Sequence, residues 1–172
     1  MALLRGINVG GRNAVAMADL RAAFEDAGHA GVRTYIQSGN VLFDAASRVD
    51  EEGVEAVLER RFGVPLVVVL RTARQLRAVV EGAPDGFGQR PDEFHSDVVF
   101  LKAPLTSRQA MRVVELREGV DQAWPGRGVV YFARDNARLT ASRMGRIVTT
   151  PEYKSMTIRS WRTTTKLLDL FG

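Results

Sequence analysis

A glycine-rich segment near the start of the chain combines residue types that bind anions. It reads Gly6-Ile7-Asn8-Val9-Gly10-Gly11-Arg12-Asn13, and it follows a short apolar run that contains Arg5. Backbone amides of such a loop, together with the N-terminus of a following helix, can cradle an anion. The predicted binding residues are Arg5, Asn8, Gly10, Gly11 and Arg12. The alternative is a glycine turn whose positive φ angles only allow the next helix to pack on its sheet.

The spacing of these glycines resembles a P-loop, but the residues after the second glycine differ from that motif. A P-loop has Lys followed by Ser or Thr there, whereas this chain has Arg12 and Asn13. The hydroxyl that would bind Mg²⁺ is therefore missing. We expect a simpler anion or polar-ligand site instead of a nucleotide P-loop.

A second polar segment reads Tyr35-Ile36-Gln37-Ser38-Gly39-Asn40. One interpretation is that Gln37, Ser38 and Asn40 present polar groups beside the glycine-rich loop. The other is a β-hairpin with strands at residues 33–38 and 41–44. In that hairpin Gly39-Asn40 forms a tight primed turn, because both residues tolerate positive φ.

A third candidate region lies toward the C-terminus. It contains Ser142-Arg143 and the run Thr157-Ile158-Arg159-Ser160-Trp161-Arg162-Thr163. Ser160 is placed to cap a closing helix whose N-terminus could hold an anion. The predicted ligand-binding residues are Ser142, Arg143, Arg159, Ser160 and Thr163. The alternative is that Trp161 packs in the core while Arg159 pairs with a carboxylate.

The charge of the chain is uneven. Residues 1–126 hold 15 Lys+Arg and 17 Asp+Glu, whereas residues 127–172 hold 9 and 3. A basic C-terminal third favours an anionic partner such as phosphate, nucleotide or nucleic acid. The alternative is a composition bias, since arginine supplies nearly all the cations.

Several function classes are excluded by composition. The chain has no cysteine, which removes disulfides, thiolate metal sites, Fe–S clusters and cysteine nucleophiles. Its two histidines, His29 and His95, cannot form a three-histidine zinc site. We assign no catalytic residue, metal or cofactor. No apolar run is long enough for a secretory signal or a membrane span, so we expect a cytoplasmic protein without a membrane partner.

The apolar spacing predicts two similar series of elements. A strand at residues 2–7 precedes a helix that stops at Gly28, then the hairpin, a helix capped by Asp50 and ended by Gly63, and a strand at residues 66–70. This order is the split β-α-β-β-α-β unit. A helix opened by Thr72-x-x-Gln75 follows it.

The order then repeats. It has a strand at residues 97–101, a helix opened by Thr106-x-x-Gln109, strands around 123–124 and 129–133, a helix near 140–148, a strand at 156–159 and a helix at 162–171. We therefore predict an α+β protein with two tandem ferredoxin-like units, antiparallel sheets and added helices, produced by duplication. Residues 1–81 form the first unit with its connecting helix, and 95–172 the second. The linker is 82–94, a stretch rich in glycine and proline.

The combination of these segments resembles a bacterial family called domain of unknown function 1697. The resemblance rests on Leu4-Arg5-Gly6-Ile7-Asn8-Val9-Gly10-Gly11, on residues 35–41 with Phe43, on Ser142-Arg143-Met144, and on residues 157–161 with Thr163, Lys166 and Leu167. It covers essentially the whole chain, although the family commonly has Asn where this chain has Ser160. The resemblance implies an α+β fold of ferredoxin-like units and a set of polar residues, shared with the family, that could form one site. It does not supply a cofactor or a reaction.

Three classes of function remain open at this point. The first is binding of an anionic small molecule or nucleic-acid backbone in a cleft between the two units, with residues 6–13 and 157–163 lining that cleft. The second is an enzyme that acts on such a ligand, with Arg5, Gln37 and Arg159 as electrostatic stabilisers. The third is a structural protein that self-associates through an open sheet face. For any of them we expect Arg5 to be partly buried and to have a polar partner, because an unpaired buried guanidinium is costly.

Overall fold

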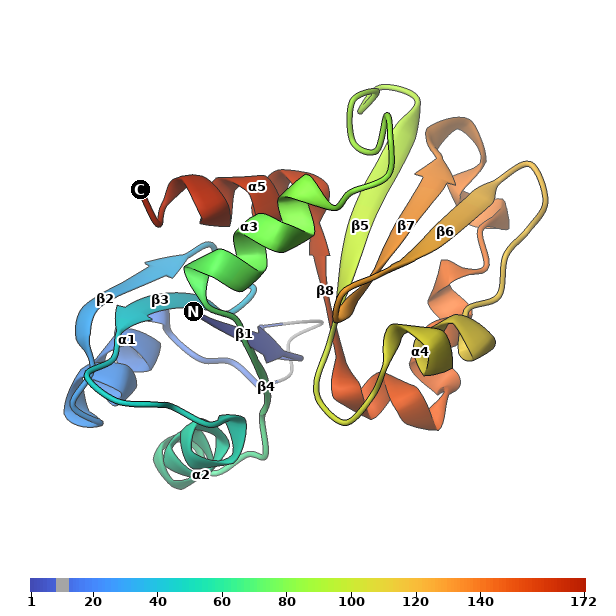
Figure 1. Cartoon of the computed structure of the whole chain (residues 1–172). Helices are drawn as coiled ribbons and strands as arrows, with labels where there is room; N and C mark the ends of the chain where they lie inside the picture. The colour runs from blue at the N-terminus through green and yellow to red at the C-terminus, as the bar shows by residue number, and fades with distance from the viewer. Residues whose placement is uncertain (9–12) are drawn as a thin grey trace. The chain divides into compact units, whose positions relative to one another are not determined.

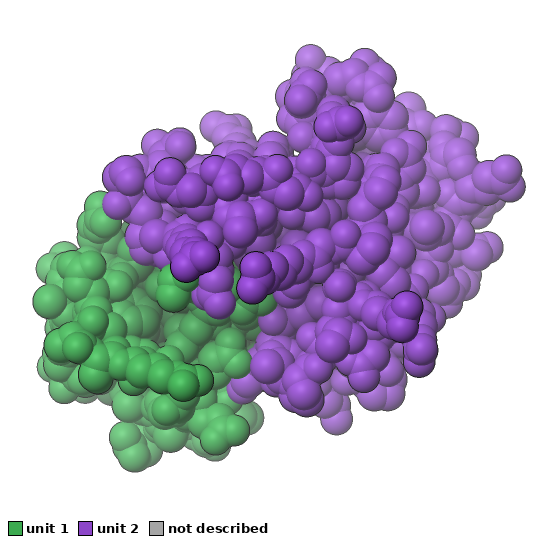
Figure 2. Space-filling model, viewed as in Figure 1, with its two compact units in different colours: residues 1–72 green, residues 73–172 purple. Residues whose placement is uncertain are grey.

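A computed structural model of the chain describes residues 1–8 and 13–172 (Figure 1). The chain forms two compact units, Met1–Thr72 and Ala73–Gly172, which Figure 2 colours separately. Each contains one four-stranded sheet whose paired strands all run antiparallel. The predicted α+β class with antiparallel sheets is therefore confirmed. No helix in the described residues is long and apolar enough to cross a membrane.

The first unit has four strands and two helices. They are β1 (Ala2–Arg5), α1 (Met17–Asp26), β2 (Ala30–Tyr35), β3 (Asn40–Asp44), α2 (Glu51–Phe62) and β4 (Val67–Leu70). The strand order in the sheet is β2-β3-β1-β4, so that β1 and β3 are central. Asp50 caps α2 through a hydrogen bond from the Gly53 amide (2.7 Å), and Gly63 ends it in the left-handed conformation, as the sequence predicts.

The core of this unit lies between its sheet and its two helices. Alternate residues of the strands, such as Ala2 and Leu4 of β1, face Leu20 and Phe24 of α1 and Leu58 of α2. This is the period of two expected of a strand that packs one face on helices. The burial fixes which way the side chains of β1 point, and it leaves Arg5 on the opposite face at the end of the strand.

The second unit repeats the strand order with different helices. It contains α3 (Ala73–Glu81), β5 (Phe94–Leu101), α4 (Ser107–Val113), β6 (Asp121–Gly126), β7 (Val129–Asp135), β8 (Met156–Ser160) and α5 (Trp161–Asp169). The sheet order is β6-β7-β5-β8. Thr106 and Gln109 form the predicted capping box at the start of α4.

Residues 82–94, predicted as a linker, and α3, predicted with the first unit, both belong to the second unit. The reason is an aromatic cluster that sequence order conceals. The ring of Phe87 lies 5.2 Å from Trp161, 5.3 Å from Tyr131 and 6.1 Å from Trp124. The Tyr131 hydroxyl also donates a 2.6 Å hydrogen bond to the carbonyl of Val79 in α3.

The helix predicted near residues 140–148 is wrong. Three short 3₁₀ segments, Asn136–Ala141, Met144–Thr149 and Pro151–Ser155, occupy this region. The Arg143 amide donates to the carboxylate of Asp121 (2.9 Å), and the Met144 amide donates to the Ser142 hydroxyl (3.1 Å). Because side chains take these two amides, they cannot form the i to i−4 bonds of an α-helix.

The predicted two-residue turn at Gly39-Asn40 is also wrong. Tyr35 pairs with Asn40, so the hairpin loop is the four residues 36–39 and Asn40 is the first residue of β3. Asn40 is fully buried, and its side-chain amide donates to the Tyr35 carbonyl (2.9 Å) and the Ser38 hydroxyl (3.0 Å). The left-handed positions are Ile36 (φ 48°) and Gly39 (φ 77°) instead.

Candidate functional site

The side chain of Asn8 joins the two polar loops of the first unit. Its amide group donates to the carbonyl of Val15 (2.9 Å) and to the carbonyl of Gln37 (3.0 Å), and its oxygen accepts from the Val15 amide (2.8 Å). Both donors of the amide are therefore used within the protein. Asn8, predicted as a ligand-binding residue, instead ties the segment after β1 to the hairpin loop.

A second asparagine closes the segment after β1. The Asn8 amide donates to the Asn13 carbonyl (3.2 Å), and the Asn13 side chain donates to the Gly6 carbonyl (3.1 Å). Gly6, Asn8 and Asn13 all have positive φ, at 73°, 54° and 49°. Glycine and asparagine are the residues that adopt this conformation most readily, which explains their choice at these positions.

The hairpin loop packs directly on the end of β1. The Leu4 amide donates to the Gly39 carbonyl (2.8 Å). A Cβ atom at Gly39 would lie 2.7 Å from Cδ1 of Ile7 and 2.8 Å from Cβ of Leu4, so only glycine fits. The loop is therefore held at the same end of the sheet as Arg5.

The structure brings together part of the predicted site. Gln37 and Ser38 lie in the hairpin loop, Asn40 follows it, and Asn8 connects this loop to the end of β1, where Arg5 is half-buried. The Gln37 side chain is exposed, whereas Ser38 and Asn40 bond to each other. Gly10, Gly11 and Arg12 lie outside the described residues.

The sequence segments that contain these loops carry charged side chains of one sign only. Residues 1–18 and 27–43 contain Arg5, Arg12 and Arg33 and no carboxylate. The carboxylates of the unit belong to its helices, to the C-terminal end of β3 and to the segment that follows it. A guanidinium beside exposed polar groups, in a stretch that lacks acids, can bind an anion such as a phosphate.

In the second unit, Arg159 is buried on the sheet face that carries Val98 and Tyr131. Its guanidinium donates to the Thr157 hydroxyl (2.9 Å) and the Ile158 carbonyl (2.8 Å), and it is 6% exposed. Burial lowers the pKa of Arg159 to about 10. Ser160 accepts from the Thr163 amide (3.2 Å) and donates to the Thr163 hydroxyl (3.0 Å), so Ser160 caps α5 as predicted.

Ser142 and Arg143 do not share that face. The backbone amide of Arg143 donates to the Asp121 side chain. Asp121 of β6 lies opposite Arg134 of β7 in the strand register, on the face of the sheet that packs against α4. Arg159 of β8 lies opposite Val98 of β5 in the strand register, on the other face of the sheet. Within the second unit the predicted residues therefore divide between two sides of one sheet, and Ser142 and Arg143 serve the 3₁₀ region.

The α4 face also holds a charged group that the sequence does not reveal. Asp97, 5% exposed, accepts from Arg134 at 2.6 Å and lies 3.2 Å from Nε2 of His95. These residues are close because β5 and β7 pair antiparallel, a register that the sequence does not specify. No group of three His, Cys, Asp or Glu residues in residues 1–8 and 13–172 is placed to hold a metal ion.

Comparisons with known proteins agree with this fold. The sequence profile of a family described as "Protein of unknown function (DUF1697)" matches residues 1–131. A solved structure of the conserved bacterial protein SP0830 from Streptococcus pneumoniae is similar, with a TM-score of 0.78 and 24% identity. That similarity covers 99% of this chain and 97% of the other, and it shows the fold. No functionally curated protein matches.

Proposed function

The chain belongs to the DUF1697 family, and we propose that its first unit binds an anionic ligand at the end of β1 and the loop 36–39. The observation that carries the proposal is the Asn8 side chain, whose three hydrogen bonds tie these two loops together beside Arg5. A frame that is ordered before binding loses less conformational entropy when a ligand binds. The three hydrogen bonds of the Asn8 side chain therefore support a ligand site at these loops.

The chemistry of the loops indicates the class of ligand. The planar guanidinium of arginine can donate to two phosphate oxygens at once, and Gln37 adds an exposed amide that can donate or accept. The ligand is therefore a phosphorylated metabolite, a nucleotide or a nucleic-acid backbone. Binding is favoured over catalysis, because neither histidine supplies a base here: His29 packs on Phe24 and Phe43, and His95 belongs to the second unit.

A contribution from residues 157–163 to the same ligand stays a prediction. The buried guanidinium of Arg159 donates to the Thr157 hydroxyl and to the Ile158 carbonyl. If both segments bind one ligand, Arg5→Gln and Arg159→Gln must each weaken binding of the same anion. Unchanged affinity in Arg159→Gln limits the site to the first unit.

We also propose that the two units are copies of one split β-α-β-β-α-β unit. The support is the correspondence of their sheet orders, β2-β3-β1-β4 and β6-β7-β5-β8, position by position along the chain. In the second copy 3₁₀ segments stand where the first copy has α2. In an experimental structure, we expect the four strands of the first unit to superpose on the four strands of the second unit in the same order.

Titration calorimetry of the whole chain tests the anion proposal. The probes are pyrophosphate, ATP and a single-stranded RNA oligonucleotide, which separate a free phosphate group, a nucleotide and a nucleic-acid backbone. Saturable binding of at least one probe is expected, and Arg5→Gln weakens it by roughly tenfold or more, as loss of a charged hydrogen bond does. The matched control is Arg60→Gln, an exposed arginine of α2.

The proposal fails if none of the three probes binds. It also fails if Arg5→Gln and Arg60→Gln change the affinity equally, because the effect is then one of net charge. Arg5→Lys, which keeps the charge, is expected to retain part of the affinity. Thermal melting of each variant shows that it is folded.

A further inference from the structure

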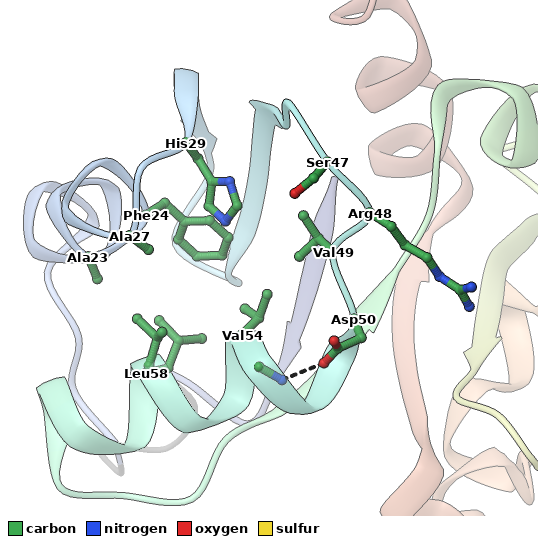
Figure 3. A pocket seen from close by; sticks show the side chains of 12 residues that line it. Ala23, Phe24, Ala27, His29, Ser47, Arg48, Val49, Asp50, Val54 and Leu58 are labelled. Atoms are coloured by element: carbon green, nitrogen blue, oxygen red, sulfur yellow. Dashed lines mark hydrogen bonds between the residues drawn. The ribbon is translucent and has the colours of Figure 1, made fainter.

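A pocket of about 250 Å³ lies in the first unit between α1, α2 and the segment before α2. It is open because the helices meet there through small residues, Ala23 and Ala27 on one side and Gly53 on the other. Its apolar walls are formed by the aromatic ring of Phe24 and by aliphatic side chains such as Val54 (Figure 3). The pocket is distinct from the loops at the end of β1.

The volume limits the ligand to a single small ring. An apolar cavity of ~150 Å³ holds benzene, and pockets for drug-sized ligands begin near ~300 Å³. Aromatic rings on one side of the pocket favour a planar occupant. The His29 ring lies 4.6 Å from Phe43, and Phe24 lies 5.1 Å from Phe43. Rings of this kind prefer tilted and offset contacts with another ring.

Two polar groups at the pocket are unpaired. Neither the His29 imidazole nor the Ser47 hydroxyl has a hydrogen-bond partner in the described part of the chain, and both side chains lie on the pocket's rim (Figure 3). A ligand group that can donate or accept a hydrogen bond fits this rim.

The charged side chains of the pocket are not available for a charged ligand. The Asp50 carboxylate accepts from the Gly53 amide, and the Arg48 side chain extends away from the pocket (Figure 3). Burial and the positive charge of the chain's N-terminus lower the pKa of His29, so its ring is neutral near pH 7. An uncharged ligand therefore matches the lining.

We propose that this pocket binds a small uncharged aromatic molecule with one ring and one hydrogen-bonding group, of the phenol class. The ring occupies the space between Phe24 and Val54, and its polar group bonds to His29 or Ser47. This site is independent of the anion proposed above, because it uses different residues and an uncharged ligand.

Titration of the whole chain with phenol, benzene and benzoate, followed by backbone amide NMR, tests the proposal. Phenol is expected to bind saturably and to shift the amides of residues 23–29 and 47–58. Benzoate has the same ring with a negative charge and is expected to bind at least about tenfold more weakly, because the Arg48 side chain extends away from the pocket and does not offset the desolvation of the carboxylate. No saturable binding of phenol, or tighter binding of benzoate, would overturn the proposal.

Three variants localise the binding. Ala27→Phe places a ring in the pocket and is expected to weaken phenol binding at least about tenfold. Ala18→Phe puts the same ring on an exposed position of α1 outside the pocket and leaves the affinity unchanged. His29→Phe keeps the ring but removes the hydrogen bond, so it weakens phenol roughly three- to tenfold and benzene hardly at all.

Equal affinity of Ala27→Phe and Ala18→Phe for phenol overturns the assignment to this pocket. If the amide spectrum shows that Ala27→Phe is unfolded, Ala27→Leu takes its place with the same expected direction. Ala27 lies at the end of α1 with φ −78° and ψ 3°, a conformation that either side chain adopts.

Discussion

The side-chain amide of Asn8 donates a 3.0 Å hydrogen bond to the backbone carbonyl of Gln37, 29 residues later in the chain. This bond joins the segment after β1 to the hairpin loop, and two further bonds join the same side chain to Val15. The arrangement places the loop that carries the exposed Gln37 at the end of β1, the strand that ends with the half-buried Arg5. Asn8 thus joins the two loops of the proposed anion site, and both donors of its side-chain amide are used within the protein.

Replacing Asn8 with alanine is expected to loosen both loops. Asn8→Ala removes three hydrogen bonds and places a residue that disfavours positive φ at 54°, so the free energy of unfolding falls by about 2–4 kcal/mol. Urea denaturation measures this loss. Asn8→Gly relieves the backbone strain but not the lost bonds, and it is expected to lie between Asn8→Ala and the wild type. Equal stability of all three would show that the bonds do not order the loops.

Gly39→Ala tests the close approach of the hairpin loop to β1. The new Cβ atom would lie under 3 Å from Leu4 and Ile7, both buried, and the φ angle is 77°. We expect a loss of about 2–5 kcal/mol from strain and overpacking together. Gly28→Ala is the matched control, with φ 87° and no atom within 4 Å, and it is expected to lose only about 1 kcal/mol. Similar losses in the two variants would contradict the packing described here.

Asp97→Asn tests the charged group on β5 and β7. The substitution keeps the shape but leaves the largely buried Arg134 without its 2.6 Å carboxylate partner. A loss of about 1–3 kcal/mol in thermal or urea unfolding is expected. Glu25→Gln removes the acid of the exposed Arg21–Glu25 pair and is expected to change stability by less than about 0.5 kcal/mol. A cost for Asp97→Asn no greater than that of the control would mean that Arg134 gains nothing from Asp97.

His29 makes stability depend on pH in a defined direction. Burial, and secondly the positive N-terminus, lower the pKa of His29 below 6.5 in the folded protein. The unfolded chain therefore takes up this proton first, and stability is lost as the pH falls through 6.5 toward the folded pKa. The free energy of unfolding measured from pH 8 to pH 5 is expected to fall less in His29→Phe than in the wild type. An identical pH dependence would contradict the partly buried, neutral imidazole.

The order of the strands and the caps of the helices could be predicted from the sequence because they depend on neighbours in the chain. Asp50 and Gly63 bound α2, and Thr106 with Gln109 opens α4, through contacts only three or four residues long. The helix near 140–148 could not be excluded in the same way. The group that takes the Arg143 amide is Asp121, 22 residues earlier and on another strand.

The sequence predicts that the hairpin segment lies beside the segment after β1, and the bond from Asn8 to the Gln37 carbonyl agrees with this. The sequence does not show that the side-chain amides of Asn8 and Asn40 donate to backbone carbonyls. Those partners are set by the four-residue loop, which a glycine-asparagine pair does not specify. The role of Phe87 was hidden for a related reason, since Trp124, Tyr131 and Trp161 all lie more than 30 residues away from it in the chain.

Backbone amide NMR during a titration with pyrophosphate tests the central claim most directly. We predict saturable shifts at Gly6, Asn8 and Gln37, and their loss or a large weakening in Arg5→Gln. Arg60→Gln is expected to give the wild-type shifts. Shifts that never saturate, or that are confined to amides outside residues 5–16 and 35–40, would contradict an anion site at these loops.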